Sequence, residues 1–194
     1  PGARAPRSLP ASDSEPPPTP VVDGERRHVT VLFADVVGFT TLSERLDAEE
    51  VRALQGELFA ELAGAIERAD GFLEKYVGDA VMAVFGAPVA HEDDPERALH
   101  VALEMHRRVA RLSDRWAARL GEPLALHAAV HTGPVVAGQL GTGAGAAYAV
   151  TGDTVNTTAR LLGAAGAGET LVGPATVERA RHAFAFEAVA PLVL

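Results

Sequence analysis

Residues 72–85 read FLEKYVGDAVMAVF, two short apolar runs on either side of Gly78 and Asp79. A Gly-Asp pair between apolar runs is typical of a tight turn, so this stretch predicts a β-hairpin with Asp79 at its tip. The strand and helix patterns before and after the hairpin then determine the fold class.

Lys75 stands three residues before the turn glycine and is the only lysine in the chain. An ammonium group is a compact donor, whereas the guanidinium group of arginine is a rigid fork. One interpretation is that Lys75 donates a hydrogen bond to a single ring nitrogen of a ligand. The other is an ordinary strand lysine paired with Glu74, and this stretch alone leaves both open.

The chain has 194 residues and is 47% apolar, which is enough for one domain with its own core. Its first 24 residues are rich in Pro, Ser, Asp and Glu, which predicts a flexible or polyproline linker. We therefore expect a linker over residues 1–24 and one domain over residues 25–194 with a truncated C-terminus. The missing initiator Met indicates a piece of a longer chain.

The formal net charge of −9 argues against a nucleic-acid partner and against binding to a membrane surface. An anionic substrate would then require a metal ion or a local cluster of cations. The chain has no cysteine, which excludes disulfides, thiolate zinc sites and cysteine nucleophiles. No apolar run approaches the roughly 18 residues of a membrane span, so we expect a cytoplasmic protein without membrane insertion.

Apolar patterns predict a strand and a helix on each side of the hairpin. Continuous apolar runs are typical of buried strands, whereas apolar residues three and four positions apart are typical of helices. The order β-α-β-β-α-β predicts an α/β (α+β) fold with a ferredoxin-like core. Its expected elements are a strand at 28–35, a helix at 47–69, the hairpin, a helix from Asp94 to Gly121 and a strand at 124–131.

Additional strands and helices are expected after this core. The last core strand is predicted to end at His131, before Thr-Gly-Pro, and residues 141–147 predict a mobile Gly/Ala loop without a phosphate-binding role. The later patterns predict a strand at 148–151, a helix from Asp153, a strand at 170–172, a helix at 175–180 and a strand at 183–188.

Asp94 and Pro95 are predicted as the N-cap and the first residue of the long helix. His91, Glu92 and Asp93 precede them, and a metal cluster is conceivable there. Acidic residues at the positive end of a helix dipole are favourable by themselves, so we favour a solvated helix start.

The predicted topology brings Asp35, at the end of the first strand, next to Asp79 at the hairpin tip. Two adjacent carboxylates can share Mg²⁺ ions together with substrate phosphates, and two such ions can assist phosphoryl chemistry. The alternative is two turn aspartates that cap nearby backbone N–H groups. Position alone leaves both interpretations open.

Asn156 and Arg160 are four residues apart, so they share one face of the predicted helix. A fixed cation and an amide can stabilise charge that develops on a transferring phosphoryl group. On spacing alone, however, an exposed surface pair is the simpler interpretation.

Together these segments resemble the catalytic domain of the class III nucleotide cyclases, over about residues 27–194. The nearest resemblance is to bacterial cyclase domains that are fused to larger ATPase or regulatory regions. Four ordered motifs carry it: FADVVGFT at 33–40, KYVGDA at 75–80, VHTG at 130–133 and GDTVNTTAR at 152–160.

The resemblance implies an adenylate cyclase that converts ATP into 3′,5′-cyclic AMP and pyrophosphate. It implies that Asp35 and Asp79 hold two Mg²⁺ or Mn²⁺ ions per site, with help from the carbonyl group of Val36. The backbone through Phe39 and Thr40 would then face the substrate phosphates.

The resemblance also assigns the nucleoside side of the site. Lys75 matches the lysine that selects adenine, and an ammonium group can donate to the unprotonated N1 of adenine. Asn156 matches the residue that orients the ribose, and Arg160 matches the one that stabilises the pentavalent phosphorus. In this family the metal aspartates come from one domain and the other three residues from its partner, which implies a head-to-tail homodimer here.

Three departures from the family pattern affect the expectations. Ala149 stands where the partner of the adenine amino group is usually Asp or Thr, and His127 stands where many members have an Arg that reaches the phosphates. Relatives also continue past Leu194 toward a lysine that binds phosphate. The alternatives are a nucleotide-binding or dimerisation module with impaired chemistry that regulates a fused partner, or a guanylate cyclase.

Overall fold

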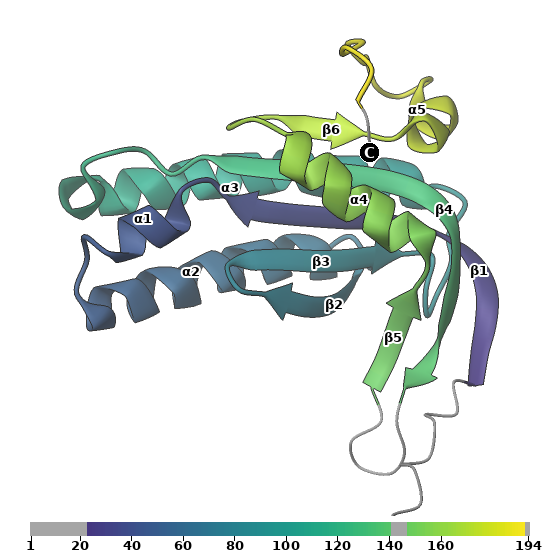
Figure 1. Ribbon diagram of the computed structural model, residues 1–194, viewed down its shortest axis with the longest axis horizontal. Coiled ribbons are helices and arrows are strands. Elements are labelled where there is room, and N and C mark those ends of the chain that lie inside the picture. Colours follow the sequence, from purple (N-terminus) through teal and green to yellow (C-terminus); the bar gives the residue numbers. More distant parts are fainter. Residues whose placement is uncertain (1–22, 141–146, 193–194) are drawn as a thin grey trace, which may run out of the picture.

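The computed structural model describes residues 23–140 and 147–192. Its strands form one mixed sheet, and helices cover both faces of that sheet (Figure 1). In chain order the elements are β1 (Asp23–Val36), α1 (Phe39–Ser43), α2 (Ala48–Glu67), β2 (Phe72–Val77), β3 (Ala80–Phe85), α3 (Asp94–Leu120), β4 (Leu126–Leu140), β5 (Ala147–Thr151), α4 (Asp153–Ala164), β6 (Thr170–Val172) and α5 (Pro174–Ala180).

The strand order β2-β3-β1-β4-β5, with β6 parallel to β4, confirms the predicted ferredoxin-like core. The central strand β1 is antiparallel to both β3 and β4. β5 and β6 lie on the same edge of β4, at its later and earlier residues respectively. This arrangement is the expected split βαβ unit with extra elements behind it.

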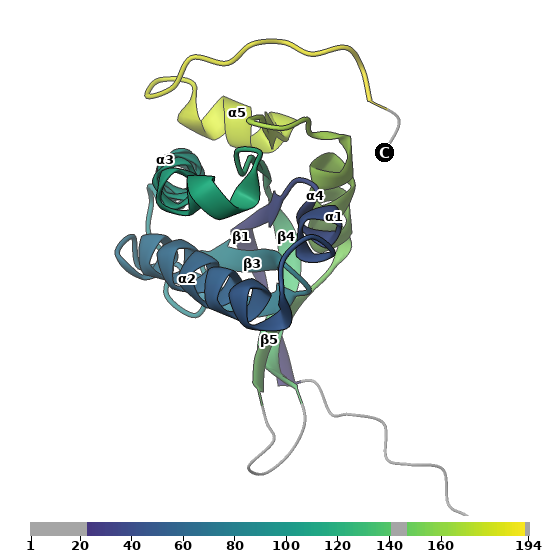
Figure 2. The same ribbon diagram turned by 90° about the vertical axis from the view of Figure 1, so that its left-hand side faces the viewer.

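The two faces of the sheet belong to separate apolar clusters, because successive strand residues point to opposite faces. Leu32 and Ala34 belong to the cluster that includes α2 and α3, whereas Val31 and Phe33 belong to the cluster on the other face. Figure 2 shows α2 and α3 on one side of the sheet and α4 on the other. Asp35 alternates with Ala34, so it lies on the face that α4 covers.

α2 and α3 form over the ranges that their apolar spacing predicts. The side chain of Asp47 accepts hydrogen bonds from the N–H groups of Glu49 and Glu50, which caps α2. α3 ends at Gly121, whose φ of +72° is left-handed. The apolar positions predicted for α3 are all buried: Leu99, Ala102, Met105, Val109, Leu112 and Trp116.

β4 does not end at His131, as the Thr-Gly-Pro signal predicted, but continues through these three residues to Leu140. The strand persists because β1 pairs with it without interruption, and Pro134 lies opposite His28. The ladder pairs on both sides of Pro134 therefore compensate for the hydrogen bond that this residue cannot donate. β1 is longer than predicted for the same reason and begins at Asp23.

The strand expected at 183–188 is not formed. Phe184 and Phe186 instead pack against the cluster of α2 and α3, and Phe184 lies 4.7 Å from the ring of His100. A strand requires a hydrogen-bonded neighbour, and within the described ranges this segment has none. The expected linker falls almost entirely outside the described residues, as do positions 141–146 of the expected loop.

Candidate active site

The hairpin tip lies beside the end of β1, as predicted. The last pair between β1 and β3 joins Ala34 to Val81. Asp35 directly follows Ala34, and Asp79 lies just before Val81 in the hairpin turn, so both lie at the same end of the two strands. Burial raises the pKa of Asp79, and the nearby charge of Asp35 raises it further. The two carboxylates therefore crowd one another at this end of the sheet.

The donor atoms at this end fit a divalent metal. Carboxylate and carbonyl oxygens are the ligands that Mg²⁺ and Mn²⁺ prefer, and a bound cation would relieve the repulsion between Asp35 and Asp79. Across residues 23–140 and 147–192, no three His, Cys, Asp or Glu residues are already close enough to hold an ion. A metal at this site would thus need oxygen donors besides the two carboxylates, such as backbone carbonyl groups, water or substrate.

The segment after Asp35 leads directly into α1. The N–H of Val36 donates to Asp35 Oδ1 at 2.9 Å, and Gly38 turns the chain with a φ of +74°. Phe39 is buried and anchors α1, whereas Thr40 is exposed. The start of α1 has no side-chain cap.

His127 lies against Asp35 because the two residues are partners in the β1–β4 ladder. Its Nε2 lies 3.4 Å from Asp35 Oδ2, and its Nδ1 lies 3.0 Å from the carbonyl oxygen of Ala165. The family pattern predicted a residue that reaches the phosphates. The structure holds this ring between the carboxylate of Asp35 and the end of α4.

Lys75 reaches the α4 face of the sheet through a β-bulge. The β2–β3 register shifts between Leu73 and Lys75, so that Lys75 lies opposite Met82, a residue of the α4-side cluster. Its Nζ is 3.1 Å from Oε2 of Glu74, whose side chain is only 5% exposed. The structure therefore shows the ion pair with Glu74 and also places Lys75 at the wall of an open pocket.

Lys75 and Asn156 line one open pocket of about 440 Å³. Arg160 is exposed on the same helix, one turn further on. Ala149 lies in β5, opposite Gly138 of β4. It does not line the pocket, although its neighbour Val150 does. The other lining residues are Thr151, Gly152, Asp153 and Val155.

The family model of the adenylate and guanylate cyclase catalytic domain matches residues 21–193. The chain belongs to this family. The cyclase domain is 31% identical over 141 residues to an adenylate cyclase of Anabaena cylindrica and 34% identical over 138 residues to adenylate cyclase 1 of Rhizobium meliloti. Both alignments cover 71% of this chain but only 27% and 21% of the relatives, which are therefore much longer proteins.

Solved cyclase structures share this fold. The adenylyl cyclase CyaB from P. aeruginosa superposes with a TM-score of 0.80 and 30% identity, covering 84% of each chain. The guanylyl cyclase Cya2 gives a TM-score of 0.76 and 33% identity, covering 81% of this chain and 80% of that one. Since both nucleotide specificities occur at similar identity, these likenesses establish a nucleotidyl cyclase fold rather than a base preference.

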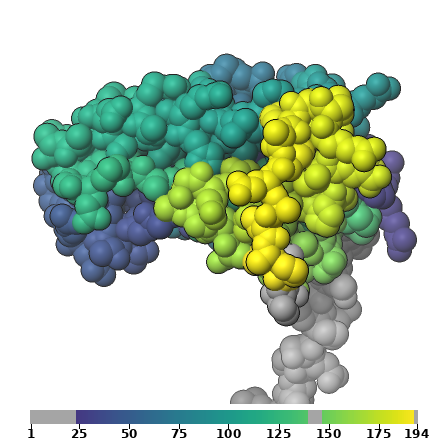
Figure 3. Space-filling model, turned by 90° about the horizontal axis from the view of Figure 1, so that it is seen from above, coloured from purple at the N-terminus to yellow at the C-terminus, as the bar shows by residue number. Residues whose placement is uncertain are grey.

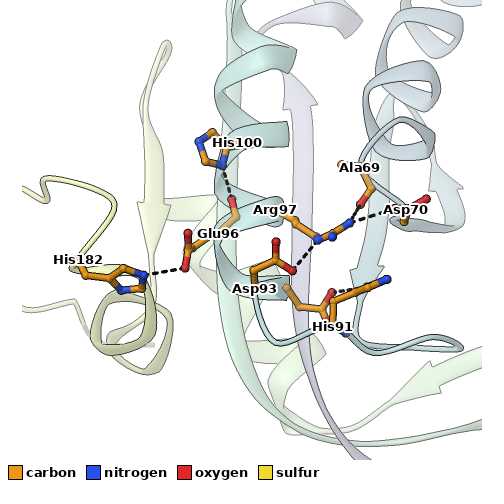
Figure 4. Close-up of polar contacts among 9 residues, drawn as sticks. Ala69, Asp70, His91, Asp93, Glu96, Arg97, His100 and His182 are labelled. Atoms are coloured by element: carbon orange, nitrogen blue, oxygen red, sulfur yellow. Dashed lines mark hydrogen bonds and ion pairs between the residues drawn. The ribbon is translucent and has the colours of Figure 1, made fainter.

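The acidic residues at the start of α3 are held by hydrogen bonds and ion pairs within the cyclase domain. Asp93, not Asp94, is the N-cap position of α3, and it forms an ion pair with Arg97 at 2.7 Å. The Asp94 carboxylate instead accepts a hydrogen bond from the N–H of His91 at 2.8 Å. As Figure 4 shows, Arg97 also forms an ion pair with Asp70. These acidic residues therefore stabilise the start of α3, and among the described residues they form no metal cluster.

An apolar hollow of about 340 Å³ lies under the C-terminal segment and contains none of the predicted site residues. Figure 3 shows this segment, in yellow, lying across one face of the molecule. Sequence patterns did not predict the hollow, because residues 183–188 were expected to form a strand. Separately, no helix in the described part of the chain is long and apolar enough to cross a membrane.

Proposed function

We propose that this domain is an adenylate cyclase, which converts ATP into 3′,5′-cyclic AMP and pyrophosphate in a site shared by two copies of the chain. The observation that carries the proposal is the pocket lined by both Lys75 and Asn156. It supports a nucleoside site with a compact cation at one wall and an amide at another. Asp35 and Asp79 supply the acidic half of such a site.

The reaction needs no nucleophile from the protein. The 3′-oxygen of the substrate ribose bonds to the α-phosphorus, the bond to the pyrophosphate oxygen breaks, and the hydroxyl proton leaves to solvent. Divalent ions held by Asp35 and Asp79, with the Val36 carbonyl, would assist deprotonation and neutralise the pyrophosphate. Arg160 would place its fixed charge against the reacting phosphate, and Asn156 would orient the ribose.

Base selection depends on the identity of residue 75. The N1 of adenine is an acceptor, whereas the N1 of guanine carries a hydrogen, so an ammonium group at the base edge favours ATP. Glu74 holds Lys75 at 3.1 Å and keeps the ammonium at the pocket wall. Ala149 offers no acceptor for the adenine amino group, and this observation, with the likeness to Cya2, favours guanylate cyclase as the second candidate.

A shared site can be tested by mixing two inactive variants. In a head-to-tail homodimer, Asp35→Asn and Arg160→Ala each disable both sites of their own dimer. Random exchange makes half of the dimers mixed, with one intact site of two, so activity should return to about a quarter of the wild-type rate. If the mixture stays as inactive as its components, the two residues act within one chain.

The function itself is tested by measuring cyclic nucleotide production from ATP and from GTP, with Mg²⁺ or Mn²⁺, over a range of protein concentrations. We expect cyclic AMP with a rate that rises more steeply than linearly with dilute protein. Cyclic GMP as the main product would establish the second candidate. ATP binding without any product would establish a regulatory nucleotide-binding module.

A further inference from the structure

The ring of His127 is fixed at both of its nitrogen atoms. Nδ1 lies 3.0 Å from the carbonyl oxygen of Ala165, and Nε2 lies 3.4 Å from Asp35 Oδ2. The side chain is 17% exposed, so little room remains for another orientation. Since β1 and β4 place His127 and Asp35 directly opposite each other, the backbone ladder enforces this contact.

The chemistry of the two contacts determines where the ring hydrogen lies. A carbonyl oxygen only accepts, so Nδ1 must carry the hydrogen that it donates to Ala165. In the neutral imidazole, Nε2 is then an acceptor with its lone pair directed toward Asp35. An ionised carboxylate also only accepts, so the contact needs a positive charge between the two atoms: either a proton on Nε2, which gives an ion pair with Asp35, or a bound metal ion.

We propose that Nε2 of His127 is a direct ligand of the divalent ion that Asp35 holds, which gives the cyclase site a nitrogen donor. This inference rests on the proposed function, because it assumes a metal at Asp35. A histidine whose other nitrogen donates to a backbone carbonyl is the usual arrangement of metal-binding histidines. Two ligand atoms about 2.1 Å from one ion lie roughly 3.0–3.4 Å apart at angles of about 90–109°, which includes the observed separation.

A nitrogen donor changes which metal the site prefers. Mg²⁺ is a hard ion that takes oxygen ligands, whereas imidazole binds first-row transition ions well. The proposal therefore predicts that the site binds Mn²⁺, which accepts an imidazole nitrogen beside its oxygen ligands, more tightly than Mg²⁺. An arginine at position 127 could not serve in this way, because a guanidinium group is always charged and has no acceptor.

The anchor of the ring also connects two parts of the site. Ala165 is the C-cap residue of α4, the helix that carries Asn156 and Arg160. The orientation of the proposed nitrogen ligand thus depends on the position of the end of α4.

The test uses Mn²⁺ alone, without nucleotide, so that the protein is the only source of nitrogen ligands. Pulsed electron paramagnetic resonance detects the coupling of a directly bound imidazole nitrogen, and labelling histidine with ¹⁵N identifies its source. We expect the coupling in the wild type and its loss in His127→Gln. His106→Gln is the matched control, since it changes another partly buried histidine and should leave the coupling intact. Titration should show that His127→Gln weakens Mn²⁺ binding on the order of tenfold and Mg²⁺ binding much less.

The outcomes separate this inference from the proposed function. Mn²⁺ that binds in an Asp35-dependent manner with oxygen ligands only would overturn the role of His127 and leave the cyclase proposal standing. Mn²⁺ binding that Asp35→Asn does not affect would overturn both the histidine ligand and the metal site. A nitrogen coupling in a protein that makes no cyclic nucleotide would support the ligand and contradict the activity.

Discussion

Gly133 lies in β4 where the first turn of α4 rests on the sheet. A Cβ atom added at this position would lie 2.6 Å from Oγ1 and 3.3 Å from Cγ2 of Thr154. Thr154 is only 4% exposed, and its hydroxyl group donates to the carbonyl oxygen of Pro134 at 2.7 Å. The substitution Gly133→Ala therefore meets a side chain that cannot turn away without losing a buried hydrogen bond.

The size of the effect follows from this contact. Ordinary contacts of a Cβ begin near 3.4 Å, so the start of α4 must move by about 0.8 Å. Overpacking of this kind costs about 1–3 kcal/mol of unfolding free energy, which lowers the Tm of a domain this size by roughly 2–12 °C. Asn156 and Arg160 move with the helix, and a misplacement near 1 Å can lower kcat on the order of a hundredfold.

Thermal unfolding and kcat at saturating nucleotide, measured well below both Tm values, check the two effects. Gly163→Ala is the matched control, because it lies in the same helix and its Cβ would meet nothing within 4 Å. Gly133→Ala combined with Thr154→Ala leaves Cβ of residue 154 at 3.5 Å, so this double variant should be less destabilised than the sum of the single ones. A Gly133→Ala protein with wild-type Tm and kcat would refute the reasoning.

Three other predictions concern single side chains. Lys75→Glu should lower kcat/KM for ATP more than for GTP, and an unchanged ratio would remove Lys75 from base recognition. Asp79→Asn should abolish metal-dependent turnover yet raise the Tm of the metal-free protein, because burial and the nearby charge of Asp35 both disfavour the ionised carboxylate; a lower Tm would contradict this. Burial lowers the pKa of His106 from 6.5, and the charge of His127 lowers it further, so the unfolded chain takes up this proton first as pH falls. Stability should therefore decline as pH falls below about 6.5, and His106→Gln should flatten that decline in a series of Tm measurements; an unchanged slope would exclude His106 as its source.

Local patterns were sufficient for the features that depend on neighbours in the chain. The Gly78-Asp79 turn lies where the apolar runs predicted it, and α3 buries the face that its spacing indicated. The approach of Asp35 to Asp79 was also predictable, because the ferredoxin-like order leaves only one place for the hairpin. The roles of these residues in catalysis remain predictions.

Features that depend on distant partners were not predictable from the sequence. The β-bulge at Glu74, which brings Lys75 to the α4 face, has no Gly or Pro to signal it. Thr-Gly-Pro looked like the end of a strand, yet long-range pairing with β1 carries β4 through it. His127 stands where many relatives have an Arg, and only the register of the ladder shows that it faces Asp35.

The unbroken β1–β4 ladder has a consequence for which length changes this domain can tolerate. Its register runs from Asp23 opposite Gln139 to Val36 opposite Leu126 without a shift. Because side chains alternate between faces, deleting one residue within β1 would exchange the faces of every residue on one side of the deletion. Either the apolar side chains or Asp35 would then face the wrong way, so natural variation in this strand should consist of substitutions, with insertions and deletions confined to its ends.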